Sequence, residues 1–434
     1  MNNLVLTPKY EAYHNSGLDW LGDIPNSWNL LANKHIFKLK KILVGKKSEE
    51  YELLSLTLKG IIKRDMDNPE GKFPAEFNTY QEVKIGDFVF CLFDVEETPR
   101  TVGLSIHNGM ITGAYTVFET SAEFNSKFLY YFYLNLDLNK RLKPLYRGLR
   151  NTIPKESFMG FKTFVPPYEQ QHFISCYLDI KTAQIDEAID IKEQEINLLK
   201  ERKQIIIQKA VTQGLDPNVP TKESGVDWIG KIPEHWEVRR SKFLFTQRKE
   251  RAWKDDIQLS ATQAYGVIPQ EQYEALTGKR VVKIQLHLDK RKHVEKDDFV
   301  ISMRSFQGGL ERAWSRGCIR SSYVVLRTLQ DIDPTFYGYV LKLPSYIAAL
   351  QQTASFIRDG QDLNFDNFSQ VDLFIPPIHE QREIANYVSS FMTSSDDVIE
   401  LLLAQIEKLK EYKTTLINSA VTGKIKITPE MVEQ

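Results

Sequence analysis

The stretch SGLDWLGDIPNSW (residues 16–28) recurs 208 residues later as SGVDWIGKIPEHW (residues 224–236), and this repeat sets the organisation of the 434-residue chain. Two shorter stretches recur at a spacing of 210 residues, namely Val165-Pro166-Pro167 with Ile375-Pro376-Pro377 and Ala210-Val211-Thr212 with Ala420-Val421-Thr422. Solenoid repeats have periods of ~20–50 residues, so this period is too long for a solenoid. The sequence therefore predicts two whole modules, each a globular body followed by a helical tail.

We place the two bodies at residues 1–165 and 216–375, and the two tails at 166–215 and 376–434. Each body contains short runs of β-forming residues bounded by turn residues, and helical runs that do not alternate with them. Two of the β runs keep the same pattern in both bodies, Leu-Ser-x-Thr and Asp-Phe-Val. This order of elements favours α+β bodies.

The tails lack Pro and Gly over residues 169–212 and 379–422, and their apolar residues step by three and four, as in a coiled coil. The predicted seam consists of Ile189, Ile196, Leu199 and Ile206 in the first tail and Ile399, Leu402, Ile406, Leu409 and Leu416 in the second. Lys203 and Lys413 hold matched positions, and Lys192 is an exception in the first tail. Because the two stripes have equal length, we expect antiparallel pairing within the molecule.

The composition is that of an ordinary globular protein, with 42% apolar and 26% charged residues. No apolar run has the length of a signal peptide core or of a membrane span. The three cysteines, Cys91, Cys176 and Cys318, are scattered and form no CxxC pair, so we expect reduced thiols and no structural zinc. These features predict a cytoplasmic protein.

The charge balance does not decide for or against a nucleic-acid partner, because 56 Lys and Arg are matched by 57 Asp and Glu. An electropositive face must therefore come from local clusters. Such clusters occur in both bodies with aromatic residues between them, for example at residues 38–41, 147–150, 248–251 and 290–293. Their recurrence favours a polyanion as partner.

The motifs of catalysis are missing or weak. Val165-Pro166-Pro167-Tyr168 lacks the leading Asn or Asp with which amino-methyltransferases hold adenine, so we interpret it as a rigid start to the tail. The nuclease-like pattern Asn68-Pro69-Glu70 with Glu82-Val83-Lys84 is short and occurs in the first body alone. No phosphate-binding GxxxxGK[ST] loop is present. We expect a non-catalytic chain with no cofactor and no metal of its own.

The duplicated opening stretch, the Pro-Pro-x-x-(Glu/Gln)-Gln steps and the coiled-coil tails together resemble the specificity (S) subunit of type I restriction–modification systems. The resemblance implies two target-recognition domains in a pseudo-two-fold arrangement, joined by two long helices that form an antiparallel coiled coil. Each domain would read one half of a bipartite, asymmetric site in double-stranded DNA. In that family two modification (methyltransferase) subunits bind S-adenosylmethionine and methylate adenine, and restriction subunits use ATP and Mg.

The resemblance also implies that the tails contact the modification subunits, with Gln171 and Gln381 at matched steps. The residue before each glutamine differs, being Gln170 in the first tail and Glu380 in the second. The two tails are therefore not expected to hold their partners identically.

Candidate DNA contacts are the polar and basic residues that follow strand-like runs or precede each Pro-Pro. Arg and Gln in particular bond bidentately to guanine and adenine in the major groove. The first body contributes Ser55, Thr57, Lys59, Lys63, Arg147, Arg150 and Asn151, and the second contributes Ser260, Thr262, Gln263, Arg304, Gln307, Arg358 and Gln361.

Two other classes of function stay open at this point. A methyltransferase or nuclease fused to recognition modules would methylate or cut DNA as a purified chain. A coiled-coil scaffold unrelated to DNA would show no salt-dependent binding to duplexes.

Overall fold

The computed structural model describes residues 8–18, 20–65, 77–282, 284, 288–302, 304–353 and 363–433. The chain divides into two compact units. Unit 1 comprises residues 1–193 with 403–434, and unit 2 comprises residues 194–402. Each unit therefore contains one body and part of both tails.

Unit 1 is built around an antiparallel sheet with the strand order β4-β11-β8-β9. These strands are β4 (Phe37–Lys40), β8 (Phe88–Phe90), β9 (Val102–Leu104) and β11 (Thr116–Thr120). The two-stranded pairs are β1 (Tyr13–Asn15) with β2 (Asp23–Pro25), β3 (Asn29–Ala32) with β12 (Lys162–Val165), β5 (Leu54–Thr57) with β6 (Gly60–Lys63), and β7 (Gln81–Val83) with β10 (Gly109–Ile111). The helices of the body are α1 (Ser126–Leu138) and α2 (Lys155–Gly160).

Unit 2 repeats this connectivity around a sheet with the order β16-β23-β20-β21. These strands are β16 (Phe245–Arg248), β20 (Phe299–Ile301), β21 (Glu311–Arg312) and β23 (Val324–Thr328). The pairs are β13 (Thr221–Glu223) with β14 (Lys231–Pro233), β15 (Glu237–Arg240) with β24 (Asp372–Ile375), β17 (Leu259–Thr262) with β18 (Gly266–Pro269), and β19 (Lys292–Val294) with β22 (Gly317–Ile319). The helices are α4 (Gln270–Thr277), α5 (Ser305–Gly308), α6 (Pro334–Val340), α7 (Pro344–Gln352) and α8 (Phe365–Gln370).

Short 3-10 helices complete the elements at Asn33–His35, Gly45–Glu50, Lys143–Leu145, Ser241–Phe243, Leu288–Lys290 and Pro429–Met431. The prediction of duplicated α+β bodies is confirmed, since strands that correspond in sequence pair with the same partners in both units. Among the described residues no helix has an apolar stretch long enough to cross a membrane.

The Asp-Phe-Val pattern marks an equivalent buried ion pair in each body. Lys40 Nζ lies 2.6 Å from Asp87 Oδ2, and Arg248 Nε lies 2.6 Å from Asp298 Oδ2. Each carboxylate also accepts the backbone N–H three residues before it, at 2.7 and 2.8 Å. A buried charge is tolerated when it is paired and hydrogen-bonded in this way. The aspartate therefore fixes the turn that leads into the central strand.

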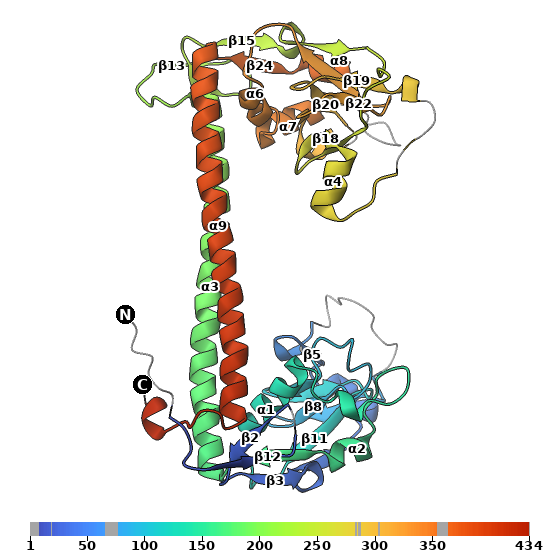
Figure 1. The fold of residues 1–434 in the computed structure, drawn as a ribbon, viewed down its shortest axis with the longest axis vertical. Helices are drawn as coiled ribbons and strands as arrows, with labels where there is room; N and C mark the ends of the chain where they lie inside the picture. The colour runs from blue at the N-terminus through green and yellow to red at the C-terminus, as the bar shows by residue number, and fades with distance from the viewer. Residues whose placement is uncertain are drawn as a thin grey trace. The chain divides into compact units, whose positions relative to one another are not determined.

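The tails form two long helices, α3 (Tyr168–Gln213) and α9 (Ile378–Val421), each starting directly after its Pro-Pro step. In unit 1, Asp186 bonds to Lys413 at 2.6 Å and Lys192 bonds to Gln405 at 2.6 Å. In unit 2, Lys203 bonds to Asp396 at 2.6 Å. As residue numbers increase along α3, the residue numbers of the bonding partners on α9 decrease, so the two helices are antiparallel (Figure 1).

The predicted seam residues lie on the more buried sides of the two helices. Ile189, Ile196, Leu402, Ile406 and Leu416 are buried, and Leu199, Ile206, Ile399 and Leu409 are half-buried. The lysines in the seam extend their ammonium groups to its edge, where they are hydrated or paired. Lys192, the exception in the first tail, donates a hydrogen bond to the side-chain amide of Gln405.

Each opening stretch ends in a buried tryptophan that packs on the end of a tail helix. Trp236 is fully buried and lies beside Gly214, which ends α3 with a φ of +76°. Trp28 and Pro25 lie in the same way against Gly423, which ends α9 with a φ of +70°. The opening stretches and the Ala-Val-Thr stretches therefore recur together because they contact each other within each unit.

We expect Gly423→Ala to destabilise unit 1 strongly. A Cβ at this position would lie 2.4 Å from Pro25 Cδ, and overpacking costs about 1–3 kcal/mol beyond the ~1 kcal/mol of a left-handed alanine. Gly17→Ala is the matched control, since Gly17 has a φ of +73° but nothing within 4 Å of its Cβ position. Thermal unfolding followed by circular dichroism should show the larger loss for Gly423→Ala, and equal losses would contradict the contact.

Candidate nucleic-acid interface

The β5–β6 hairpin carries four of the predicted DNA contacts in the first body. Thr57 Oγ1 donates to Gly60 O at 3.0 Å and accepts from Lys59 N at 3.1 Å, so this hydroxyl closes the turn. Ser55 is half-buried, and Lys63 lies 3.7 Å from Glu52. The tip presents Lys59 and Leu58, whose side chain is 65% exposed.

A second exposed loop of the first body holds Arg147, Arg150 and Asn151. Its ends pair through Arg147 and Thr152, and Asp94 N donates to Arg150 O at 2.8 Å. The Arg147 guanidinium donates to carbonyls of its own loop, whereas the Arg150 side chain is exposed. Asn151 takes a positive φ of 44°, which suits an asparagine in a tight turn.

In the second body, Thr262 has the same role as Thr57, because its Oγ1 donates to Gly266 O at 3.1 Å. The structure also brings together Gln263 and Arg304, since Gln263 Nε2 donates to Arg304 O at 3.0 Å. Ser260 is half-buried and Gln307 is exposed in α5. Arg358 and Gln361 lie outside the described residues, so their role stays a prediction.

The basic clusters contribute less surface charge than the sequence suggested. Lys40 and Arg248 are used in the buried ion pairs, and Arg291 is buried. Lys292 Nζ donates to Tyr323 O at 2.6 Å, and burial lowers its pKa. These residues stabilise the body, because strand pairing turned them inward, and they are not free to contact a polyanion.

His293 lies at the centre of a charged network in the second body. Its side chain is excluded from solvent, with Nδ1 2.7 Å from Asp256 Oδ2 and Nε2 2.9 Å from Glu295 Oε1. Trp253 stacks on the ring at 3.9 Å, and the guanidinium of Arg316 lies over Trp253 at 4.6 Å. Burial alone lowers the pKa of His293, but the bonds to the two carboxylates outweigh it and raise that pKa above its ordinary value.

Gln171 and Gln381 face the interior of their own units. Gln171 Oε1 accepts from Asn125 N at 2.8 Å, and its Nε2 donates to Pro166 O at 2.9 Å. Gln381 makes the equivalent bonds to Asp333 N and Pro376 O, both at 2.8 Å. Because both side chains are buried, their matched recurrence is explained by a role in joining each tail helix to its body.

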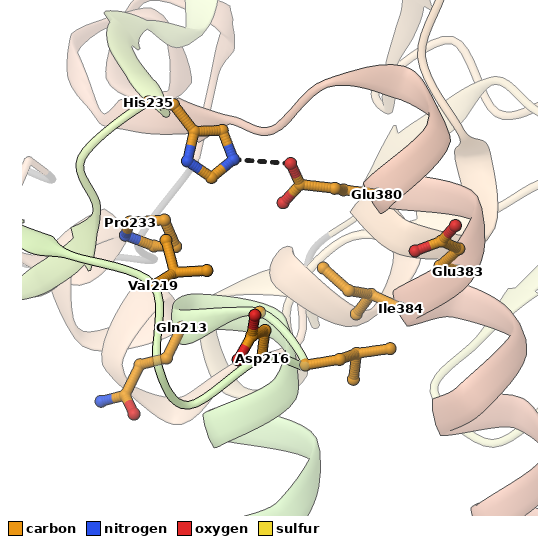
Figure 2. Close-up of a pocket in the computed structure, with 10 residues that line it drawn as sticks. Gln213, Asp216, Val219, Pro233, His235, Glu380, Glu383 and Ile384 are labelled. Carbon is orange, nitrogen blue, oxygen red and sulfur yellow. Dashed lines mark hydrogen bonds and ion pairs between the residues drawn. The ribbon is translucent and has the colours of Figure 1, made fainter.

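The difference between Gln170 and Glu380 changes how each tail helix is held. Glu380 accepts from Trp236 Nε1 at 2.9 Å. Its Oε1 also lies 2.5 Å from His235 Nε2 (Figure 2). His235 and Glu380 line a cavity of about 250 Å³ in unit 2, together with Glu383 and Asp216. The first body has Ser27 at the place of His235, so unit 1 lacks this carboxylate clamp.

Some exposed groups near the candidate contacts were missed by sequence reasoning. Leu149 is fully exposed between Arg147 and Arg150, and Leu58 is exposed beside Lys59. In unit 2, Tyr265 and Trp314 line a cavity of about 420 Å³. The two leucines could have been selected from the sequence, because each is an apolar residue inside a turn that contains Gly and basic residues. Nothing in the sequence pattern indicated the cavity.

Among the described residues, no group of three His, Cys, Asp or Glu side chains is arranged to hold a metal ion. The segment Asn68-Pro69-Glu70 of the nuclease-like pattern lies outside the described residues. Its second half is described, and there Lys84 pairs with Glu82 at 3.2 Å.

Residues 233–408 match the family model of the type I restriction modification DNA specificity domain. A curated relative, a putative type I restriction enzyme MjaX specificity subunit from Methanocaldococcus jannaschii, is 23% identical over 287 residues. The second body and most of the second tail helix therefore resemble a type I restriction modification DNA specificity domain, and the chain is similar to a specificity subunit. The alignment covers 64% of this chain and 62% of that relative.

Two solved structures share the fold. A chain from a study of complex assembly and conformational transition of the type I R-M system has a TM-score of 0.65 at 12% identity, covering 92% of this chain and 98% of its own length. The HsdS subunit from Thermoanaerobacter tengcongensis has a TM-score of 0.54 at 13% identity, covering 95% of this chain and 100% of its own. The specificity-subunit fold is thus kept although few residues are shared.

The His293 network makes the stability of unit 2 depend on pH. A histidine with a raised folded pKa stabilises the fold fully below its unfolded value of ~6.5, and that stabilisation is lost as pH rises through the folded pKa. We expect His293→Gln to cost about 1.5–3 kcal/mol at pH 6 and progressively less toward pH 9. Urea unfolding of both proteins across this range checks it, and a difference that does not change with pH would show that folding does not shift the pKa of His293.

Proposed function

We propose that this chain is the DNA-recognition subunit of a type I restriction–modification complex and that it carries out no chemistry itself. The first body (residues 1–165) and the second body (residues 216–375) each read one half of a bipartite, asymmetric site. The match of the specificity-domain model to the second body supports this proposal, and so does the similarity to a type I specificity subunit. A fused methyltransferase or nuclease has no comparable support.

The observation that carries the proposal is that one framework presents different side chains in the two bodies. The β5–β6 tip offers Leu58 and Lys59, whereas the β17–β18 tip offers Gln263 beside Arg304. Apolar groups contact the thymine methyl, lysine bonds to guanine, and glutamine pairs with adenine. Two readers of different chemistry on matching scaffolds fit a site whose halves differ in sequence.

The chemistry belongs to partner subunits in this proposal. Two modification subunits supply S-adenosylmethionine and adenine methylation, and restriction subunits supply ATP, Mg and cleavage. Exposed apolar side chains on the paired helices of unit 2 offer a docking surface for the modification subunits, since Leu198 is 65% exposed and Ile205 and Leu401 are each 58% exposed. Salt-dependent contacts to phosphates supply most of the affinity for DNA, and a few base contacts supply the specificity.

Exchanging the first body tests the division of labour. The chain is co-expressed with its modification subunit, and residues 1–165 are replaced by the first body of another specificity subunit. Sequencing of methylated bases in the host genome should show one half of the methylated motif changed and the other half kept. A change in both halves would contradict independent reading, and methylation by the purified chain alone would revive the fused-enzyme alternative.

We further propose that the paired helices set the length of the unread gap between the half-sites. Inserting one heptad after Glu193 in α3 and another after Ala404 in α9 keeps the seam and lengthens both helices by about 10 Å. At ~3.4 Å per base pair, the gap in the methylated motif should grow by about three base pairs.

A two-residue insertion after Glu193 alone is the control. It rotates the later seam residues by about 200°, so pairing with α9 should be lost and the unfolding temperature should fall. An active heptad variant with an unaltered gap would show that the helices serve for packing and do not measure DNA.

A further inference from the structure

The amide of Gln263 is held in one orientation by its surroundings in unit 2. Its Nε2 donates to Arg304 O at 3.0 Å, and its own backbone carbonyl accepts from Lys342 Nζ at 3.0 Å. Lys342 is fixed in turn by Glu311, whose Oε2 lies 2.9 Å away and whose side chain is buried. Both the main chain and the side chain of this exposed residue are therefore positioned before any ligand binds.

Gly308 makes this orientation sterically feasible. A Cβ at position 308 would lie 2.3 Å from Gln263 Nε2 and 2.5 Å from its Cδ. Gly308 closes α5, the short helix that begins directly after Arg304. The same segment thus provides both the carbonyl that binds the amide and the space that the amide occupies.

The bond to Arg304 leaves the base-reading capacity of Gln263 intact. A glutamine amide has two N–H groups and a carbonyl oxygen, and one N–H is used here. Within the described part of the chain, the Oε1 atom makes no hydrogen bond. One donor and one acceptor, side by side on a planar group, match the N7 acceptor and the N6 amino group of adenine.

The other bases fit this arrangement less well. Guanine presents two acceptors, N7 and O6, so Oε1 would face an oxygen that repels it. Cytosine offers a donor alone and thymine an acceptor with a methyl group, so neither uses both atoms of the amide.

We propose that Gln263 is a specificity-determining residue that reads an adenine in the half-site of the second body, positioned for this by Arg304 O and Gly308. The proposal rests on the proposed function, because it assigns one base to one of the two readers. Oε1 accepts from adenine N6, and the remaining Nε2 hydrogen donates to N7. Gln263 contacts the base, whereas Gly308 acts through Gln263.

The experiment starts from the methylated motif of the wild-type complex with its modification subunit. Binding of the complex is then measured on duplexes in which each position of the second half-site carries each of the four bases. Gln263→Ala should lose discrimination at one adenine by about 10- to 100-fold and leave the other positions unchanged. Gln272→Ala in α4 is the control, because Gln272 is exposed and makes no predicted contact.

Gln263→Glu gives a change of preference that a purely structural role would not produce. The carboxylate keeps an acceptor and loses the donor, so the preferred base at the same position should shift from adenine toward cytosine. Gly308→Ala should weaken discrimination at that position alone, because it displaces the amide. The unfolding temperature of each variant shows whether it is folded.

The outcomes separate this inference from the proposed function. If the wild-type complex reads a bipartite motif and Gln263→Ala leaves that motif unchanged, the inference is wrong and the proposed function stands. Relaxation at a base other than adenine also overturns it. If the wild-type complex recognises no bipartite motif, the proposed function fails and the inference falls with it.

Discussion

Each unit depends on one contact, the packing of a buried tryptophan against the glycine that ends a tail helix. Trp236 lies against Gly214 in unit 2, and Trp28 lies against Gly423 in unit 1. The body, the first turns of one tail helix and the last turns of the other meet at this point and share one apolar core in unit 2. Unit 1 is therefore assembled from two segments that are far apart in the sequence, whereas unit 2 is continuous. Bodies of different surface chemistry can be built on this arrangement, because the contact involves none of their exposed loops.

The tails could be predicted from the sequence because they depend on local rules. About forty residues without Pro or Gly and a three-four apolar rhythm define a paired helix whatever lies nearby. Whether a basic side chain points inward or toward solvent could not be predicted. Lys40 and Asp87, for example, are 47 positions apart in the sequence, and only strand pairing brings them into contact. Thr57 and Thr262 were selected as DNA contacts for their polarity, but turn closure explains them equally well. The contact between Gln263 and Arg304 could not be predicted for the same reason, because the two residues are 41 positions apart in the sequence.

The two units are alike in framework and differ in charge at the helix start. Unit 2 holds Glu380 between Trp236 and His235, whereas unit 1 has the neutral Gln170 at this step. The glutamine that follows is buried and makes the same two backbone bonds in both units. The shared residue thus defines the geometry of the joint, and the variable residue before it changes the charge and the hydrogen bonds around the buried tryptophan.

The composition of unit 1 has a consequence for the order of events during synthesis. Tyr13 bonds to Gly423 O across 410 residues, and Arg141 bonds to Asn418 across 277. Unit 2 is one continuous stretch, so all of its residues leave the ribosome before the α9 residues that complete unit 1. Domains usually fold as units from the N-terminus during translation, and contacts of such sequence separation form slowly. The body that is synthesised first is therefore the last to be completed. Until α9 is made, the apolar surface around Trp28 stays exposed to chaperones and to non-native contacts with other helices.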